Sequence, residues 1–125
     1  MSQAFIELTA RPASPRAARD LVRHAADRAH WSGDVDAAVL GASEIVTNAL
    51  QHTGSVGELH VVISESRLRV EAEDFGAGEP HVCAPAATDL GGRGLAIVEC
   101  LSFAWGVTSR GGSGKTVWFE IDGAA

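Results

Sequence analysis

Two pairs of strand-like segments in this chain are each joined by a short turn. The first pair is 58–64 with 67–73, and the second pair is 104–108 with 116–121. Within 67–73, apolar residues alternate with charged ones, which is typical of a strand that buries one face. Short connections join neighbouring antiparallel strands, whereas parallel strands need a long crossover. The sequence therefore predicts a mostly antiparallel sheet.

Two consecutive helices are predicted between a short strand at 4–8 and the first hairpin. Ser14 can cap the first helix, and Pro15 suits its first helical position. The second helix runs from about 34 to 51 and carries an apolar stripe of helical period. The positions expected on its buried side are Val35, Val39, Ala42, Val46, Ala49 and Leu50.

A third helix is expected to begin near Gly92, ahead of the second hairpin. Helices and strands do not alternate strictly, so a doubly wound fold is excluded. The sequence predicts an α+β fold. We expect a two-layer α/β sandwich whose mixed, mostly antiparallel sheet is covered on one face by helices.

The size and composition of the chain indicate one domain spanning residues 1–125. The net charge of −6 argues against direct binding to nucleic acid. No apolar run approaches the roughly 20 residues of a membrane span, and the N-terminus lacks the pattern of a signal peptide. We therefore expect a cytoplasmic protein that does not contact a membrane.

Four arginines lie near helical spacing in the first predicted helix, namely Arg16, Arg19, Arg23 and Arg28. Such a run is most often a solvated helix surface. It can also form a basic face for an acidic partner, and the sequence leaves both interpretations open.

Glu44 and Asn48 lie one turn apart on the second predicted helix. One interpretation is the solvent side of an amphipathic helix. The other is a metal–phosphate site, because an amide oxygen can ligate Mg²⁺ and a carboxylate can accept a proton from a hydroxyl.

Two glycine-rich segments follow. Asp74-x-Gly76-x-Gly78 comes at a strand end, and is either a turn or a place where the backbone approaches a flat ligand. Gly91-Gly92-Arg93-Gly94 precedes the third helix, whose free N–H groups attract phosphate. The segment 112–116 superficially resembles a P-loop but precedes a strand, so it is interpreted as a hairpin turn.

Together, these motifs resemble the N, G1 and G2 boxes of the gyrase/heat-shock-chaperone/histidine-kinase/MutL (GHKL) ATP-binding superfamily. The boxes are Glu44-x-x-x-Asn48, Asp74-x-Gly76-x-Gly78 and Gly92-x-Gly94. The resemblance spans nearly the whole chain and implies a Bergerat-type ATP-binding fold. The small size is similar to that of the stand-alone anti-sigma-factor serine kinases.

The resemblance also implies roles for the matching residues, with ATP and Mg²⁺ as cofactors. Asn48 would ligate Mg²⁺, and Glu44 would be the general base for a partner's serine hydroxyl. Asp74 would bind the adenine amine, supported by Thr116. Gly76 and Gly78 would make room for the base, and 79–91 would be a lid. The phosphates would be held by Gly92, Arg93 and Gly94. His52 matches a common histidine of such proteins, for which a structural role is equally open.

The function implied is that of an ATP-binding regulatory protein. It would be an anti-sigma factor with protein serine/threonine kinase activity. It would sequester a sigma factor, phosphorylate an anti-anti-sigma partner and form a homodimer. The alternative is a non-catalytic module whose partner binding depends on nucleotide. The catalytic domain of a histidine kinase is less favoured, because the sequence shows no phosphoacceptor helix.

Overall fold

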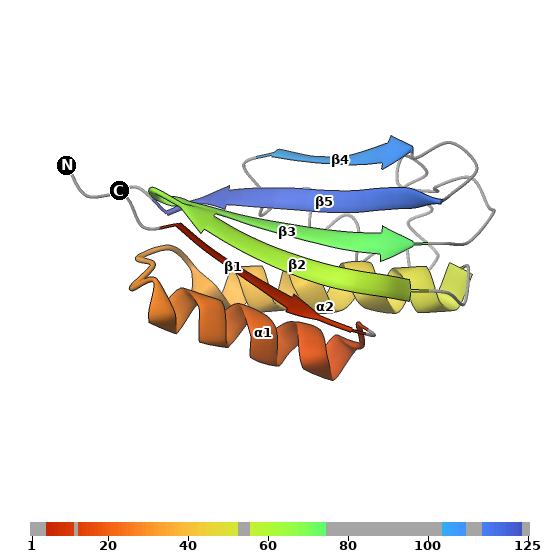
Figure 1. The fold of residues 1–125 in the computed structure, drawn as a ribbon, viewed down its shortest axis with the longest axis horizontal. Helices are drawn as coiled ribbons and strands as arrows, with labels where there is room; N and C mark the ends of the chain where they lie inside the picture. The colour runs from red at the N-terminus through yellow and green to blue at the C-terminus, as the bar shows by residue number, and fades with distance from the viewer. Residues whose placement is uncertain (1–4, 12, 53–55, 75–103, 110–113, 124–125) are drawn as a thin grey trace.

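The computed structural model of this chain describes residues 5–11, 13–52, 56–74, 104–109 and 114–123. These residues form a sheet and two helices, which lie together on one face of the sheet (Figure 1). In chain order the elements are β1 (Phe5–Ala10), α1 (Pro15–Arg28), α2 (Val35–His52), β2 (Val56–Ser64), β3 (Arg67–Asp74), β4 (Ala104–Ser109) and β5 (Lys115–Asp122). The predicted α+β two-layer fold is confirmed. The third helix, expected near Gly92, lies outside the described residues.

The strands are arranged in the order β1-β2-β3-β5-β4, and each described pair is antiparallel. Both predicted hairpins, β2–β3 and β4–β5, are present. The pairing of β3 with β5 joins segments that are far apart in the sequence. Its register places Asp74 opposite Lys115 and Glu73 opposite Thr116, and this register determines which side chains meet at the end of β3.

Both helices begin where side-chain caps are available. The Ser14 hydroxyl accepts a hydrogen bond from the Ala17 amide at 3.1 Å, and proline follows at the start of α1. A carboxylate oxygen of Asp34 accepts from the Ala37 amide at 3.0 Å ahead of α2. Both side chains satisfy amides that the first helical turn leaves without partners. The predicted start of α1 is confirmed.

The core lies between the helices and the sheet, and small residues let the two layers approach closely. α1 packs on β1 and β2, while α2 packs on β2, β3 and β5. Gly41 of α2 faces the Phe119 ring, and a Cβ added there would lie 2.8–2.9 Å from three ring atoms. This contact is tighter than normal packing and places α2 against the centre of β5.

One residue expected in the core is not there. Leu50 is 41% exposed, whereas Ile45, which was not among the expected core positions, is 2% exposed. Successive helical residues are about 100° apart. Leu50 therefore lies at the edge of the stripe whose centre, in this part of α2, is filled by Ile45, Val46 and Ala49.

Trp31 fastens the connection between the helices to the sheet. Its indole N–H donates to the Ser66 carbonyl at 2.7 Å, and the Gly123 amide donates to the same carbonyl at 2.7 Å. The Ser32 hydroxyl donates to the Gly123 carbonyl at 3.1 Å. These bonds join the α1–α2 connection, the β2–β3 turn and the end of β5, so this end of the molecule is closed by hydrogen bonds to backbone carbonyls.

Candidate functional site

A buried pair of opposite charges lies where β3 ends and β5 begins. Asp74 is 2% exposed and Lys115 is 7% exposed. The Lys115 ammonium lies 3.3 Å from Oδ2 of Asp74, and the two residues are direct partners in the antiparallel register. A lone buried charge is costly, whereas a close counter-charge offsets much of that cost. The carboxylate predicted to recognise adenine is therefore held at the strand end beside an ammonium group.

Thr116 lies on the other face of the sheet from Asp74. It is half-buried and pairs with Glu73, and the alternation of β5 puts it on the opposite face of the sheet from Lys115 and Val117. The structure therefore does not bring Thr116 to Asp74, and its role in binding a base stays a prediction. The β5 residue that lies beside Asp74 is Lys115.

Asn48 presents a buried acceptor from the helical layer. Its Oδ1 has less than 1 Å² of exposed surface and makes no hydrogen bond within the described part of the chain. Leaving a buried acceptor unsatisfied costs about 1–3 kcal/mol, so a ligand bonded to this oxygen would be stabilising. An amide oxygen suits a hard cation such as Mg²⁺. The amide oxygen of Asn48 therefore fits the predicted role of a metal ligand.

Glu44 lies one turn before Asn48 and is also half-buried. The polar side of α2 is thus partly covered, which disfavours the interpretation that it is a plain solvent face. α2 packs on β3 and β5, and its C-terminal end lies at the same end of the molecule as the end of β3 (Figure 1). The helix supplies Glu44 and Asn48 to this end, and the sheet supplies Asp74 and Lys115.

The remaining predicted site residues lie outside the described part of the chain. They are Gly76, Gly78, the lid 79–91, Gly92, Arg93 and Gly94. His52 ends α2, but its side chain is likewise not described. The roles assigned to these residues stay predictions.

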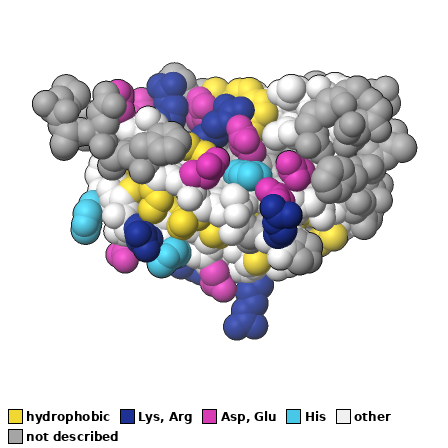
Figure 2. Space-filling view, in the orientation of Figure 1, with side chains coloured by type: hydrophobic (Ala, Val, Ile, Leu, Met, Phe, Trp, Pro, Cys, Tyr) yellow, Lys and Arg dark blue, Asp and Glu magenta, His cyan; other side chains and the backbone are white. Residues whose placement is uncertain are grey.

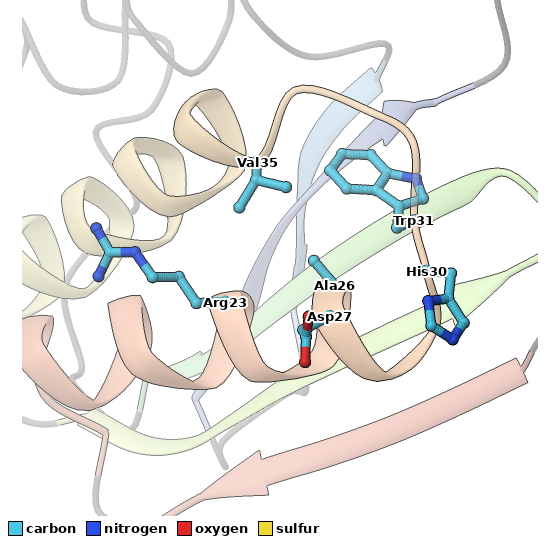
Figure 3. A pocket seen from close by; sticks show the side chains of 6 residues that line it. All are labelled: Arg23, Ala26, Asp27, His30, Trp31 and Val35. Carbon is cyan, nitrogen blue, oxygen red and sulfur yellow. The ribbon is translucent and has the colours of Figure 1, made fainter.

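A shallow pocket of about 310 Å³ lies at the other end of α2 and is separate from this site. It is lined by Arg23, Ala26, Asp27, His30, Trp31 and Val35 (Figure 3). Val35 is the first residue of α2, 13 positions before Asn48, which corresponds to about 20 Å along a helix axis. The pocket therefore belongs to the junction between the helices.

The face of the sheet that the helices leave open carries a charged network. Glu58, His60 and Glu73 bring potential ligand atoms within 4.8 Å of one another. However, Nε2 of His60 lies 2.8 Å from Glu58, which also pairs with Arg11, and Glu73 accepts a hydrogen bond from the Glu58 amide. Figure 2 shows acidic side chains gathered around a histidine. The mutual pairing accounts for the cluster without a metal ion.

Arg69 on the same face lies 4.2 Å from the centre of the Trp118 ring. Burial lowers the pKa of its guanidinium, but hydrogen bonds to Glu71 and Glu120 outweigh burial and leave the pKa above its ordinary value. Charge pairs and the cation–π contact of Arg69 with Trp118 thus stabilise the described part of the open face.

Sequence and structure comparisons agree on the family of the chain. The sequence profile of the histidine kinase-like ATPase domain matches residues 8–121, so the chain belongs to this family. Over 87 residues it is 40% identical to blue-light-activated histidine kinase 2 of Erythrobacter litoralis (strain HTCC2594), covering 63% of this chain and 25% of that protein. The chain thus spans about a quarter of this curated relative.

Solved structures of a related protein show the same fold. The blue-light activated histidine kinase EL346 of Erythrobacter litoralis superposes with a TM-score of 0.53 and 37% identity, covering 72% of this chain and 31% of that chain. A structure of its histidine kinase domain gives a TM-score of 0.53 and 34% identity, covering 83% of this chain and 57% of that one. The family is one of ATPases and kinases, which agrees with the GHKL resemblance of the motifs.

Proposed function

We propose that this chain is an ATP-binding regulatory domain that transfers phosphate to a serine of a protein partner, as anti-sigma-factor kinases do. The observation that carries the nucleotide-binding part is the buried Oδ1 of Asn48, which makes no hydrogen bond to any of the described residues. This atom lies on the helix that packs over the strand ending in Asp74. The proposed partners are a sigma factor, which the chain would sequester, and an anti-anti-sigma protein that carries the serine.

In this proposal, the sheet supplies the residue that binds the base, and helix α2 supplies the metal ligand and the general base. Asp74 would accept hydrogen bonds from the exocyclic amine of the base, and Asn48 would be a ligand of Mg²⁺. Bound Mg²⁺ would neutralise charge on the transferring phosphate. Glu44 accepts the proton of the attacking serine hydroxyl. Because phosphoryl transfer depends mostly on positioning and electrostatics, a rigid helix and a buried strand end are suited to it.

The test compares Asn48→Ala with Gln51→Ala, because Gln51 is an exposed amide on the same helix. Asn48→Ala removes a buried acceptor that has no partner within the described residues, so thermal stability should not fall. Its affinity for ATP in the presence of Mg²⁺ should fall by about tenfold or more, while Gln51→Ala binds normally. Wild-type affinity in Asn48→Ala would remove the metal-ligand assignment.

A second candidate is the catalytic domain of a histidine kinase, because the relatives that share 34–40% identity are histidine kinases. The two candidates differ in the acceptor. Phosphoserine survives acid, whereas phosphohistidine is hydrolysed by it. Acid treatment of the phosphorylated partner, after incubation with labelled ATP, therefore separates them. Retention of the label supports serine transfer, and loss of the label supports the histidine kinase.

A third candidate is a non-catalytic module in which nucleotide changes the affinity for a partner. It predicts partner binding that depends on ATP and leaves no phosphorylated product.

Among the described residues, no helix combines the length and hydropathy needed to cross a membrane.

A further inference from the structure

Lys115 is the only lysine in the chain, and its ammonium group is buried at the predicted base site. Strand β5 alternates buried and half-buried residues, and Lys115 shares the buried side with Val117, Phe119 and Ile121. Long amphipathic side chains usually carry their charge to water. This one instead keeps its ammonium beside the Asp74 carboxylate, at 3.3 Å.

The pair places a hydrogen-bond donor directly next to an acceptor. An ionised carboxylate only accepts, and an ammonium group only donates, with three N–H bonds. Two adjacent groups of opposite character can read two adjacent atoms of a flat ligand, as bidentate contacts do when proteins recognise bases.

Adenine presents the complementary pattern. Its exocyclic amine donates, and two ring nitrogens, N1 on one edge and N7 on the other, accept on the two sides of the amine. With the amine on Asp74, one of these ring nitrogens faces the neighbouring side chain. Guanine in the same orientation places a carbonyl oxygen against Asp74, which creates an acceptor–acceptor conflict.

We propose that Lys115 is a specificity-determining residue of the base site, donating a hydrogen bond to the ring nitrogen beside the adenine amine that Asp74 accepts. This inference rests on the proposed nucleotide-binding function and deepens it. In this proposal Lys115 and not Thr116 is the neighbour of Asp74 at the base, because the β3–β5 register puts the Thr116 side chain on the other face of the sheet. A charged donor replaces a hydroxyl, which strengthens the contact and increases discrimination.

The first test uses analogues that lack one acceptor each. Calorimetric titrations compare ATP, 1-deaza-ATP and 7-deaza-ATP, all with Mg²⁺. The wild-type protein should bind at least one analogue about tenfold or more weakly than ATP, because the Lys115 donor then faces a C–H group. Equal affinity for all three nucleotides overturns the inference.

The second test repeats the titrations with Lys115→Met, which keeps an unbranched side chain but removes the donor. The preference for ATP over the analogue should shrink to about twofold or less. If Lys115 were only a counter-ion for Asp74, the variant would weaken ATP and the analogue equally and the preference would persist. That result overturns the inference.

A third measurement needs no substitution and covers the case in which Lys115→Met does not fold. Protein labelled with ¹⁵N only at lysine Nζ gives one ammonium signal by NMR, because the chain has one lysine. The signal should shift on addition of ATP and Mg²⁺, and shift less with the discriminated analogue. An unchanged signal at saturating ATP contradicts a direct contact.

These outcomes separate the inference from the function on which it rests. If the wild-type protein binds no ATP, the nucleotide-binding proposal fails and the role of Lys115 fails with it. If ATP binds but the deaza analogues bind equally well, only the role of Lys115 is lost.

Discussion

Glu44 and Asn48 lie one turn apart on α2, and both are half-buried. Their chemistry is nevertheless different. The amide oxygen of Asn48 is neutral and suits a cation, whereas the Glu44 carboxylate can take a proton. Binding and phosphoryl transfer should therefore respond separately to substitution at the two positions.

Replacing Glu44 by alanine should leave nucleotide binding within about twofold of wild type, because the general base acts in the transition state. Transfer to a serine-bearing partner should slow by about 10²–10⁴-fold. A labelled-ATP transfer assay measures the rate, and calorimetry measures the affinity. Asp36→Ala is the matched control, since Asp36 is an exposed carboxylate in the first turn of α2. Transfer at the wild-type rate by Glu44→Ala would exclude the assignment.

Local sequence patterns predict the elements of the fold, but they do not predict which residue lies beside Asp74. The Ser14 cap, the two helices and the two hairpins follow from neighbouring residues, and the structure confirms them. The meeting of Asp74 and Lys115 depends on the register between strands about 40 positions apart, and a one-residue slip would exchange the faces. The signal available in the sequence was the alternation of β5, in which position 115 falls on the same side as Val117.

At the scale of elements, the closeness of α2 to β5 depends on Gly41. Alanine would raise helix propensity by about 1 kcal/mol. Its Cβ would meet Phe119 ring atoms at 2.8–2.9 Å, and overpacking costs about 1–3 kcal/mol. We expect Gly41→Ala to lower the free energy of unfolding by about 1 kcal/mol, or the melting temperature by about 3–6 °C.

The control for this prediction is a double-mutant cycle with Phe119→Leu, which removes the ring that Gly41 faces. In that background, Gly41→Ala should become neutral or stabilising, because only the gain in helix propensity remains. The same loss of stability in both backgrounds would mean that the contact with Phe119 is not what constrains α2. Thermal unfolding followed by circular dichroism measures all four proteins.

At the scale of the whole molecule, the two ends of the sandwich are built differently. The end near Trp31 is closed by hydrogen bonds between the helix connection, the β2–β3 turn and the end of β5. The other end carries a buried ion pair and, on α2, a buried amide oxygen that has no hydrogen-bond partner among the residues that the structure describes. Unsatisfied or charged buried groups are uncommon in a core and are typical of ligand sites. This contrast locates the proposed nucleotide site at the end where β3 terminates.

The most direct test of a nucleotide site at this end is a calorimetric titration with ATP and with ADP, each with and without Mg²⁺, run beside Asp74→Asn. We predict saturable binding that weakens without Mg²⁺ and is lost in Asp74→Asn, because the amide offers one acceptor where the carboxylate offers two. Thermal unfolding of the variant checks that the loss is not due to unfolding. Absence of saturable binding in the wild-type protein would contradict the nucleotide site on which the proposed function depends.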